Sequence, residues 1–154
     1  MVLEEAICKS AIKLNLESTE KDEVFEELIE EMVSVNPGLD RREALLAVQE
    51  REAKMSTGIL PGIAVPHGKV SGIKDVKVVI GISKAGIEYD SLDGKPVHVI
   101  ILLLSAPESC ELHLRVLKHL ARLLEADKFY AELLEKKTPQ EVYDLICKYE
   151  EELH

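Results

Sequence analysis

Residues 99–104, Val-Ile-Ile-Leu-Leu-Leu, are apolar without interruption. A strand with one face in water alternates apolar and polar side chains, whereas a strand covered on both faces does not. Even when it is extended back to residue 97, the run is far too short to span a bilayer. We therefore predict an α/β fold, in which a mixed sheet of about five strands is flanked by helices on both sides. The chain of 154 residues is expected to form one domain, 1–154.

Three further stretches have the character of strands. Residues 76–83 mix β-branched residues with small ones and predict a central strand. Residues 87–90 and 97–105 flank the turn pair Asp93-Gly94, which predicts an antiparallel hairpin. Residues 11–16 alternate apolar and polar side chains and are also strand-like.

Helical spacing of apolar residues predicts two helices before the central strand. The first contains residues 24–33, begins at a cap on Ser18 or Thr19, and ends at the Asn-Pro-Gly of residues 36–38. The second begins at the cap residue Asp40 and ends at about residue 53, with Arg51 in its last turn. From these residues alone, Arg51 needs no other role than to compensate the negative end of the helix dipole.

Three helices are predicted after the last strand. The first begins near residues 107–109 and is apolar enough for near-complete burial. A break at residues 126–127 starts a shorter helix, and the Thr-Pro at 138–139 starts a terminal one. The charged residues 150–154 are expected to be a solvated, fraying end.

Residues 58–69 are punctuated by glycine and proline and cannot form a helix. They predict a loop, a short strand over 63–65, and an abrupt turn that presents His67 between Pro66 and Gly68. Such a turn displays an imidazole with little freedom of direction. Taken alone, the same residues also fit a histidine in an ordinary surface turn.

Charge and cysteine content exclude several classes of protein. The formal net charge of −10 argues against a nucleic-acid binder, because phosphate backbones attract basic surfaces. The cysteines, Cys8, Cys110 and Cys147, are widely spaced and indicate neither a disulfide framework nor a zinc site. The sequence contains no pair of histidines at the helical spacing that would predict a metal site. His98 is interpreted as a structural residue. The first residues lack the pattern of a signal peptide, so a cytoplasmic location is the expectation.

A longer pattern surrounds the His67 turn. Arg51-Glu52, Ser56-Thr57-Gly58 and the Gly-Ile-Ala-Val-Pro-His-Gly of residues 62–68 are followed downstream by Glu-Leu-His-Leu, which contains His113. This pattern resembles the enzyme IIA components of the bacterial sugar phosphotransferase system, of the fructose/mannitol type and including its nitrogen-regulatory branch. The likeness extends over nearly the whole chain.

The resemblance implies a set of site residues. His67 would be the phosphoryl acceptor, with His113 and Arg51 as the other catalytic residues. Ser56, Thr57, Gly58 and Gly68 would bind phosphate. Without the resemblance, His113 fits a core histidine and residues 56–58 fit the loop that ends a helix.

The resemblance also implies a function. His67 would accept a phosphoryl group from the phosphocarrier protein HPr and pass it to a cysteine of an enzyme IIB component, with no cofactor and no metal. The membrane would be involved only through the IIC component. The alternatives are a regulatory protein controlled by phosphorylation and a binding domain that lacks the chemistry. Leu60-Pro61 departs from the family pattern, and Leu60, Ile63 and Val65 are the predicted partner surface.

Overall fold

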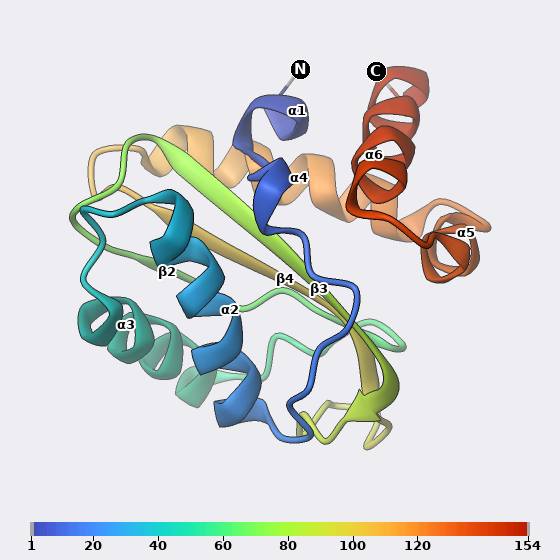
Figure 1. Cartoon of the computed structure of the whole chain (residues 1–154), viewed down its shortest axis with the longest axis horizontal. Helices are drawn as coiled ribbons and strands as arrows, with labels where there is room; N and C mark the ends of the chain where they lie inside the picture. The colour runs from blue at the N-terminus through green and yellow to red at the C-terminus, as the bar shows by residue number, and fades with distance from the viewer. Residues whose placement is uncertain (1, 154) are drawn as a thin grey trace.

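The computed structural model describes residues 2–153 as a sheet between two layers of helices (Figure 1). The strands are β1 (Ile63–Ala64), β2 (His67–Lys69), β3 (Val76–Ile87) and β4 (Val97–Ser105). The helices are α1 (Val2–Ala6), the 3-10 turn η1 (Lys9–Ala11), α2 (Lys21–Val35), α3 (Arg41–Lys54), α4 (Cys110–Glu125), α5 (Phe129–Glu135) and α6 (Pro139–Leu153). Within this part of the chain, no helix combines the length and the apolar character needed to cross a membrane.

Strand β4 is the centre of the sheet. On one side it pairs antiparallel with β3, from Val76 opposite Ser105 to Ile87 opposite Val97. On its other side it pairs parallel first with β1 and then with β2, where His67 lies opposite Leu103. The same strand therefore positions both the approach to His67 and His67 itself.

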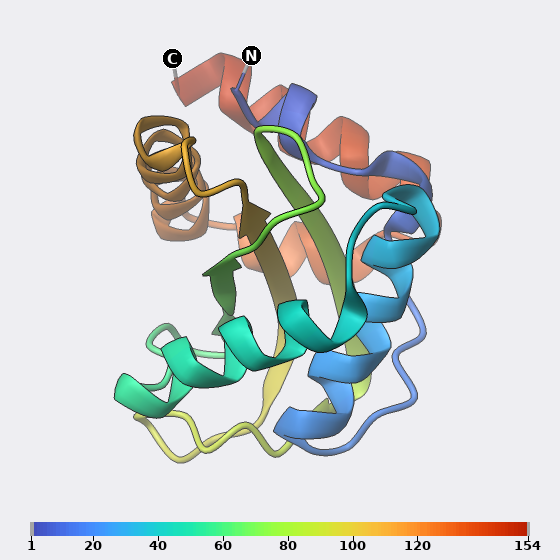
Figure 2. The same cartoon turned by 90° about the vertical axis from the view of Figure 1, so that its left-hand side faces the viewer.

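Alternate side chains of β4 enter two separate cores, which explains its uninterrupted apolar sequence. Val99, Ile101 and Leu103 pack with α1, α4, α5 and α6, whereas Ile100, Leu102 and Leu104 pack with α2 and α3. Figure 2 shows these helices on opposite sides of the strands. The predicted α/β architecture, with helices on both faces of a mixed sheet, is confirmed.

The predicted strands need four corrections. The described residues form a sheet of four strands instead of about five. Residues 11–16 are not a strand: they form one isolated bridge to β3, Lys13 to Gly81, with a few backbone hydrogen bonds beside it, and the 3-10 turn Lys9–Ala11 occupies the start of this stretch. Residues 87–90 are not a separate strand, since β3 continues to Ile87 across a register shift, and the central strand is β4 and not 76–83.

The helices agree closely with the sequence prediction. Asp40 caps α3 by accepting from the backbone N–H groups of Arg42 and Glu43, at 2.9 and 3.1 Å. Helix α2 begins later than expected, because Glu20 and Glu23, rather than Ser18 or Thr19, form its capping box. The predicted fraying tail is wrong at Glu150, which is fully buried in α6 and accepts from the backbone N–H of Leu3 at 2.8 Å.

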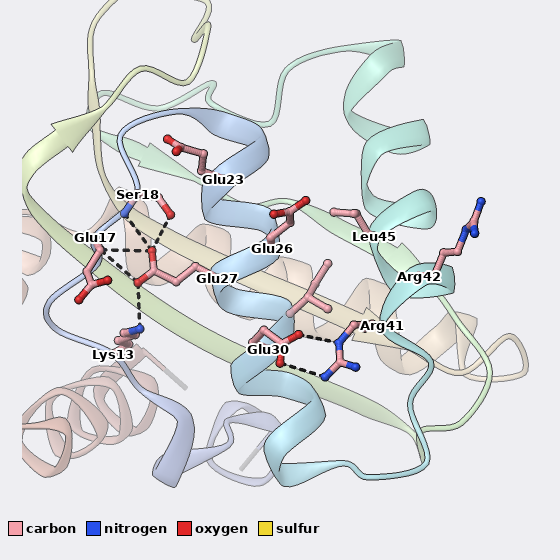
Figure 3. Close-up of a pocket in the computed structure, with 11 residues that line it drawn as sticks. Lys13, Glu17, Ser18, Glu23, Glu26, Glu27, Glu30, Arg41, Arg42 and Leu45 are labelled. Atoms are coloured by element: carbon pink, nitrogen blue, oxygen red, sulfur yellow. Dashed lines mark hydrogen bonds and ion pairs between the residues drawn. The ribbon is translucent and has the colours of Figure 1, made fainter.

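Carboxylates on α2 hold the neighbouring segments in place (Figure 3). Glu27 accepts from the Ser18 hydroxyl at 2.6 Å and from the Lys13 ammonium at 2.9 Å. Glu30 forms a bidentate pair with Arg41 at the start of α3. Burial raises the pKa of Glu27, but the donors from Ser18 and Lys13 outweigh it and lower the pKa to about 2. These residues also line a pocket beside α2 and α3, and its charges serve the packing of α2 against its neighbours.

Candidate active site

The connection from β1 to β2 fixes the tautomer of His67. The predicted abrupt turn is wrong, because β1 and β2 pair with β4 in the same parallel register and His67 is the first residue of β2. The Nδ1 atom of His67 lies 2.9 Å from the carbonyl oxygen of Val65. A carbonyl can only accept, so in the neutral ring Nδ1 carries the proton and Nε2 holds the free lone pair. Burial, together with the nearby charge of Arg51, lowers the pKa of His67, although the bond to Val65 opposes this effect. His67 is therefore neutral near pH 7, and its Nε2 lone pair is free to act as a nucleophile.

His113 lies beside His67, in the first turn of α4. The two ring centroids are 5.3 Å apart, and the planes meet at 66°. Its Nδ1 atom is 2.6 Å from the hydroxyl of Ser105, the last residue of β4. Burial is the main reason why the pKa of His113 is lowered to about 4, with smaller contributions from His67 and Lys69. A second neutral imidazole thus faces the first.

Arg51 reaches the same place from the last turn of α3. One guanidinium nitrogen, Nη1, donates to the carbonyl oxygen of Met55 at 2.9 Å. Arg51 and His67 line one cavity of about 250 Å³. The remaining lining is mainly apolar: Met55, Ser56, Thr57, Ile59, Leu60, Ile63, Val65, Leu117, Leu120, Ala121 and Leu124. The cavity thus places a fixed cation and a nucleophile within apolar walls.

A buried carboxylate lies behind this cavity. The side chain of Glu52 is only 4% exposed. It accepts from the backbone N–H and the hydroxyl of Thr57 at 2.8 and 2.7 Å, and from the Tyr89 hydroxyl at 3.1 Å. The Lys21 ammonium of α2 lies 3.1 Å away. These neighbouring groups therefore all donate hydrogen bonds or carry positive charge, and they stabilise the ionised carboxylate of Glu52.

Glu52 is linked to His67 through the backbone. Glu52 holds Thr57, whose carbonyl oxygen accepts from the N–H of Val65 at 3.3 Å. The carbonyl of Val65 in turn accepts from His67 Nδ1. Three successive hydrogen-bonded contacts thus connect a buried charge to the ring that carries the nucleophile. Glu52 positions His67 without touching it.

The predicted phosphate-binding residues take different places. Ser56 lines the cavity, and its Oγ accepts from the Gly58 N–H at 3.1 Å, which leaves its own proton available. Thr57 is buried, and both of its donors are engaged by Glu52. Gly68 lies against α3, where a Cβ would come within 3.1 Å of the Ala47 Cβ. Arg51, Ser56, Thr57 and His67 line the same cavity, and the ring of His113 lies beside that of His67.

Three contributors were missed in the sequence: Glu52, Tyr89 and Ser105. A signal for Glu52 exists, because the buried positions of α3 are Ala44, Val48 and Glu52, at a spacing of four residues. A carboxylate that continues an apolar stripe requires buried donors. Within residues 2–153, no group of His, Cys, Asp and Glu side chains is arranged to hold a metal ion.

The chain is similar to characterised proteins over nearly its whole length. The sequence model of the family "Phosphoenolpyruvate-dependent sugar phosphotransferase system, EIIA 2" matches residues 5–149. The fructose-specific EIIABC component of Bacillus subtilis is 33% identical over 97% of this chain, which spans 24% of that protein. The fructose-specific EIIA component of Haloferax volcanii is 32% identical, with 83% of each chain covered.

Solved structures show the same relationship. The nitrogen regulatory protein IIA-Ntr from Neisseria meningitidis superimposes with a TM-score of 0.87 at 27% identity, and the match covers 95% of this chain and 99% of that one. The family match includes the segment from Arg51 to His67 and the helix that carries His113. The chain therefore belongs to the EIIA type 2 family of the phosphoenolpyruvate-dependent sugar phosphotransferase system.

Proposed function

We propose that His67 relays a phosphoryl group from HPr to an enzyme IIB component during sugar uptake. The observation that carries this proposal is the bond from His67 Nδ1 to Val65, which leaves Nε2 as a neutral nucleophile beside Arg51 and His113. The P–N bond in phosphorylated HPr breaks as a P–N bond forms at His67 Nε2. In the second step the thiolate of an IIB cysteine attacks, so a P–S bond replaces that P–N bond.

The surrounding residues have separate tasks in this transfer. Arg51 donates one N–H group to the carbonyl oxygen of Met55. Its other N–H groups stabilise the negative charge on the oxygens of the phosphoryl group during transfer. His113 stays neutral and donates one ring N–H, while Ser56 adds a hydroxyl donor. Thr57, Gly58 and Gly68 support the phosphate site through the backbone geometry that they impose.

The proposed partner surface consists of the apolar residues that surround the cavity. Ile59 and Leu114 are each 59% exposed, and Met55 is 52% exposed. Leu60 and Val65 are half-buried beside them, whereas Ile63 is buried and forms the floor. Exposed apolar residues around a recessed nucleophile suit a transient protein partner. Under this proposal the protein acts in the cytoplasm and meets the membrane only through the IIC component.

The first test is incubation with phosphoenolpyruvate, enzyme I and HPr, followed by intact-mass analysis. Wild type should gain one acid-labile phosphoryl group, and His67→Ala should gain none. His119→Gln is the matched control, because His119 lies outside the cavity and contacts Glu150. Arg51→Ala should slow labelling about 100-fold. Full labelling of the His67→Ala variant would rule out the assignment.

A regulatory role is the second candidate, and the likeness to the Neisseria nitrogen regulatory protein favours it. Both roles require the phosphorylated His67, so the acceptor distinguishes them. Phosphorylated protein should be mixed with a fructose-type IIB component and the IIB cysteine examined by mass. Transfer supports the relay in sugar uptake, whereas a stable phosphoprotein whose binding to another protein changes with phosphorylation supports regulation.

A further inference from the structure

Another cavity, of about 690 Å³, lies between the strands β3 and β4 and the connection from α5 to α6. Its charged lining residues are Lys84, Lys136, Lys137 and Glu135. His98, Tyr130 and Asn15 add polar groups, and Leu14, Ile82 and Leu134 add apolar surface. Three lysines against one glutamate make this hollow basic in a chain whose net charge is −10. Such a local reversal of charge attracts anions.

Two further polar side chains in this cavity, His98 and Tyr130, have atoms available to a ligand. The Nδ1 atom of His98 lies 2.9 Å from the carbonyl oxygen of Ser83, so it carries the proton and Nε2 is left unengaged. Among the described residues, the hydroxyl of Tyr130 has no hydrogen-bond partner, and burial raises its pKa, so it remains a neutral donor. Gly86, at φ +93°, leaves room for the His98 ring, since a Cβ there would approach Cε1 to 3.1 Å.

The same two residues contact the segment that leads to His67. The carbonyl oxygen of Gly62 accepts from the backbone N–H groups of His98 and Val99, at 2.8 and 3.0 Å. The Tyr130 hydroxyl lies so close to Gly62 that a Cβ at Gly62 would overlap it. Gly62 immediately precedes β1, which leads to His67 at the start of β2. Gly62 therefore connects two residues of this cavity, His98 and Tyr130, to the segment that leads to His67.

We propose that this cavity binds a small organic anion, with two or more carboxylate or phosphate groups on a short carbon skeleton, and that the bound anion acts on the His67 segment through Gly62. Lys84, Lys136 and Lys137 pair with the anionic groups, and Tyr130 donates to them. Leu14 and Leu134 contact the carbon skeleton. The binding site is independent of the relay function, because none of its residues takes part in phosphoryl transfer.

The test is a titration of the full chain followed by amide NMR at constant ionic strength. The probes are citrate, a tricarboxylate, and 3-phosphoglycerate, which carries a phosphate ester, so the two sources of negative charge are compared directly. We expect saturable shifts at Lys84, His98 and Lys136, accompanied by a shift at Gly62. The variant Lys136→Gln/Lys137→Gln should weaken binding of the tighter probe about tenfold or more.

The matched control is Lys118→Gln/Lys148→Gln, which removes the same charge from exposed positions outside the cavity. Equal weakening by both double variants, or no saturable shift with either probe, would overturn the site. Saturable shifts at the cavity without one at Gly62 would overturn the link to His67. Neither measurement needs enzyme I or HPr, so a failure here is distinct from a failure of the relay.

Discussion

Replacing Glu52 by glutamine tests the buried carboxylate with almost no change in volume. The amide oxygen can still accept from one donor on Thr57, but its NH₂ group then faces a donor from Tyr89 or Thr57. Lys21 also loses its ionic partner. A hydrogen bond to a buried charge contributes about 1.5–3 kcal/mol, and breaking a buried pair costs about 3–5 kcal/mol.

We therefore expect Glu52→Gln to lower the free energy of unfolding by about 3 kcal/mol. For a chain of this length, that loss lowers the midpoint of thermal unfolding by about 6–12 °C. Circular dichroism during heating or urea titration at pH 7 measures it. Glu50→Gln is the matched control, because Glu50 is exposed on the same helix. Equal stability of the two variants would refute the reasoning.

The dependence on pH gives a second check on Glu52. Burial raises its pKa, but the bonds from Thr57 and Lys21 outweigh this effect and hold the pKa below its usual value. A carboxyl group with a depressed folded pKa stabilises the fold above its unfolded pKa of about 4.3 and loses that contribution as the pH falls further. The stability gap between wild type and Glu52→Gln should therefore narrow on acidification below that point.

The third readout is the ring of His67. The carboxylate of Glu52 raises the pKa of His67, so its removal should lower that pKa, as measured by NMR titration. A loosened Thr57 should also weaken the bond between Val65 and His67 Nδ1. An unchanged pKa and an unchanged tautomer signal in Glu52→Gln would contradict the positioning role, even if the variant is less stable.

Three further predictions concern other parts of the molecule. Because the pKa of His113 is lowered to about 4, its NMR titration should show no midpoint near the ordinary histidine value of about 6.5, where a midpoint would contradict its burial. Glu27, with a pKa of about 2, stabilises the fold above the unfolded pKa and loses this effect as the pH falls toward 2. The free energy of unfolding of Glu27→Gln should therefore depend less on pH in the acid range than that of wild type. The same acid dependence in both proteins would contradict the stabilising role of the ionised Glu27. Gly62→Ala should lose about 2 kcal/mol in urea titration, since φ is +77° and the new methyl group overlaps Tyr130. Adding Tyr130→Phe should recover part of the loss, and no recovery would place the strain elsewhere.

Local patterns in the sequence predicted most of the fold. The apolar run of β4 predicted a strand between two helical layers, and Asp40 predicted the start of α3, because both signals depend on neighbouring residues alone. The stretch at 11–16 also alternates, yet it forms one isolated bridge to β3 and no regular ladder. Alternation shows which side chains can be buried, but it does not show whether the backbone meets a partner in regular register.

The site was predictable only in part. His67 and Arg51 belong to one continuous pattern, whereas Ser105 meets His113 through the turn between β4 and α4. Glu52 finds Tyr89 at a separation of 37 residues. Such partners are chosen by the packing of distant segments, and no local signal in this chain specifies them.

The two ends of the described chain lie beside each other (Figure 1). Glu150 of α6 accepts from the backbone N–H of Leu3 at 2.8 Å and of Glu4 at 3.3 Å. A domain whose two ends are adjacent can be inserted into a longer polypeptide without stretching either connection. It also tolerates circular permutation, in which a short linker joins the old ends and new ones open in an exposed loop. Because its ends are adjacent, this fold is suited to insertion into other polypeptide chains.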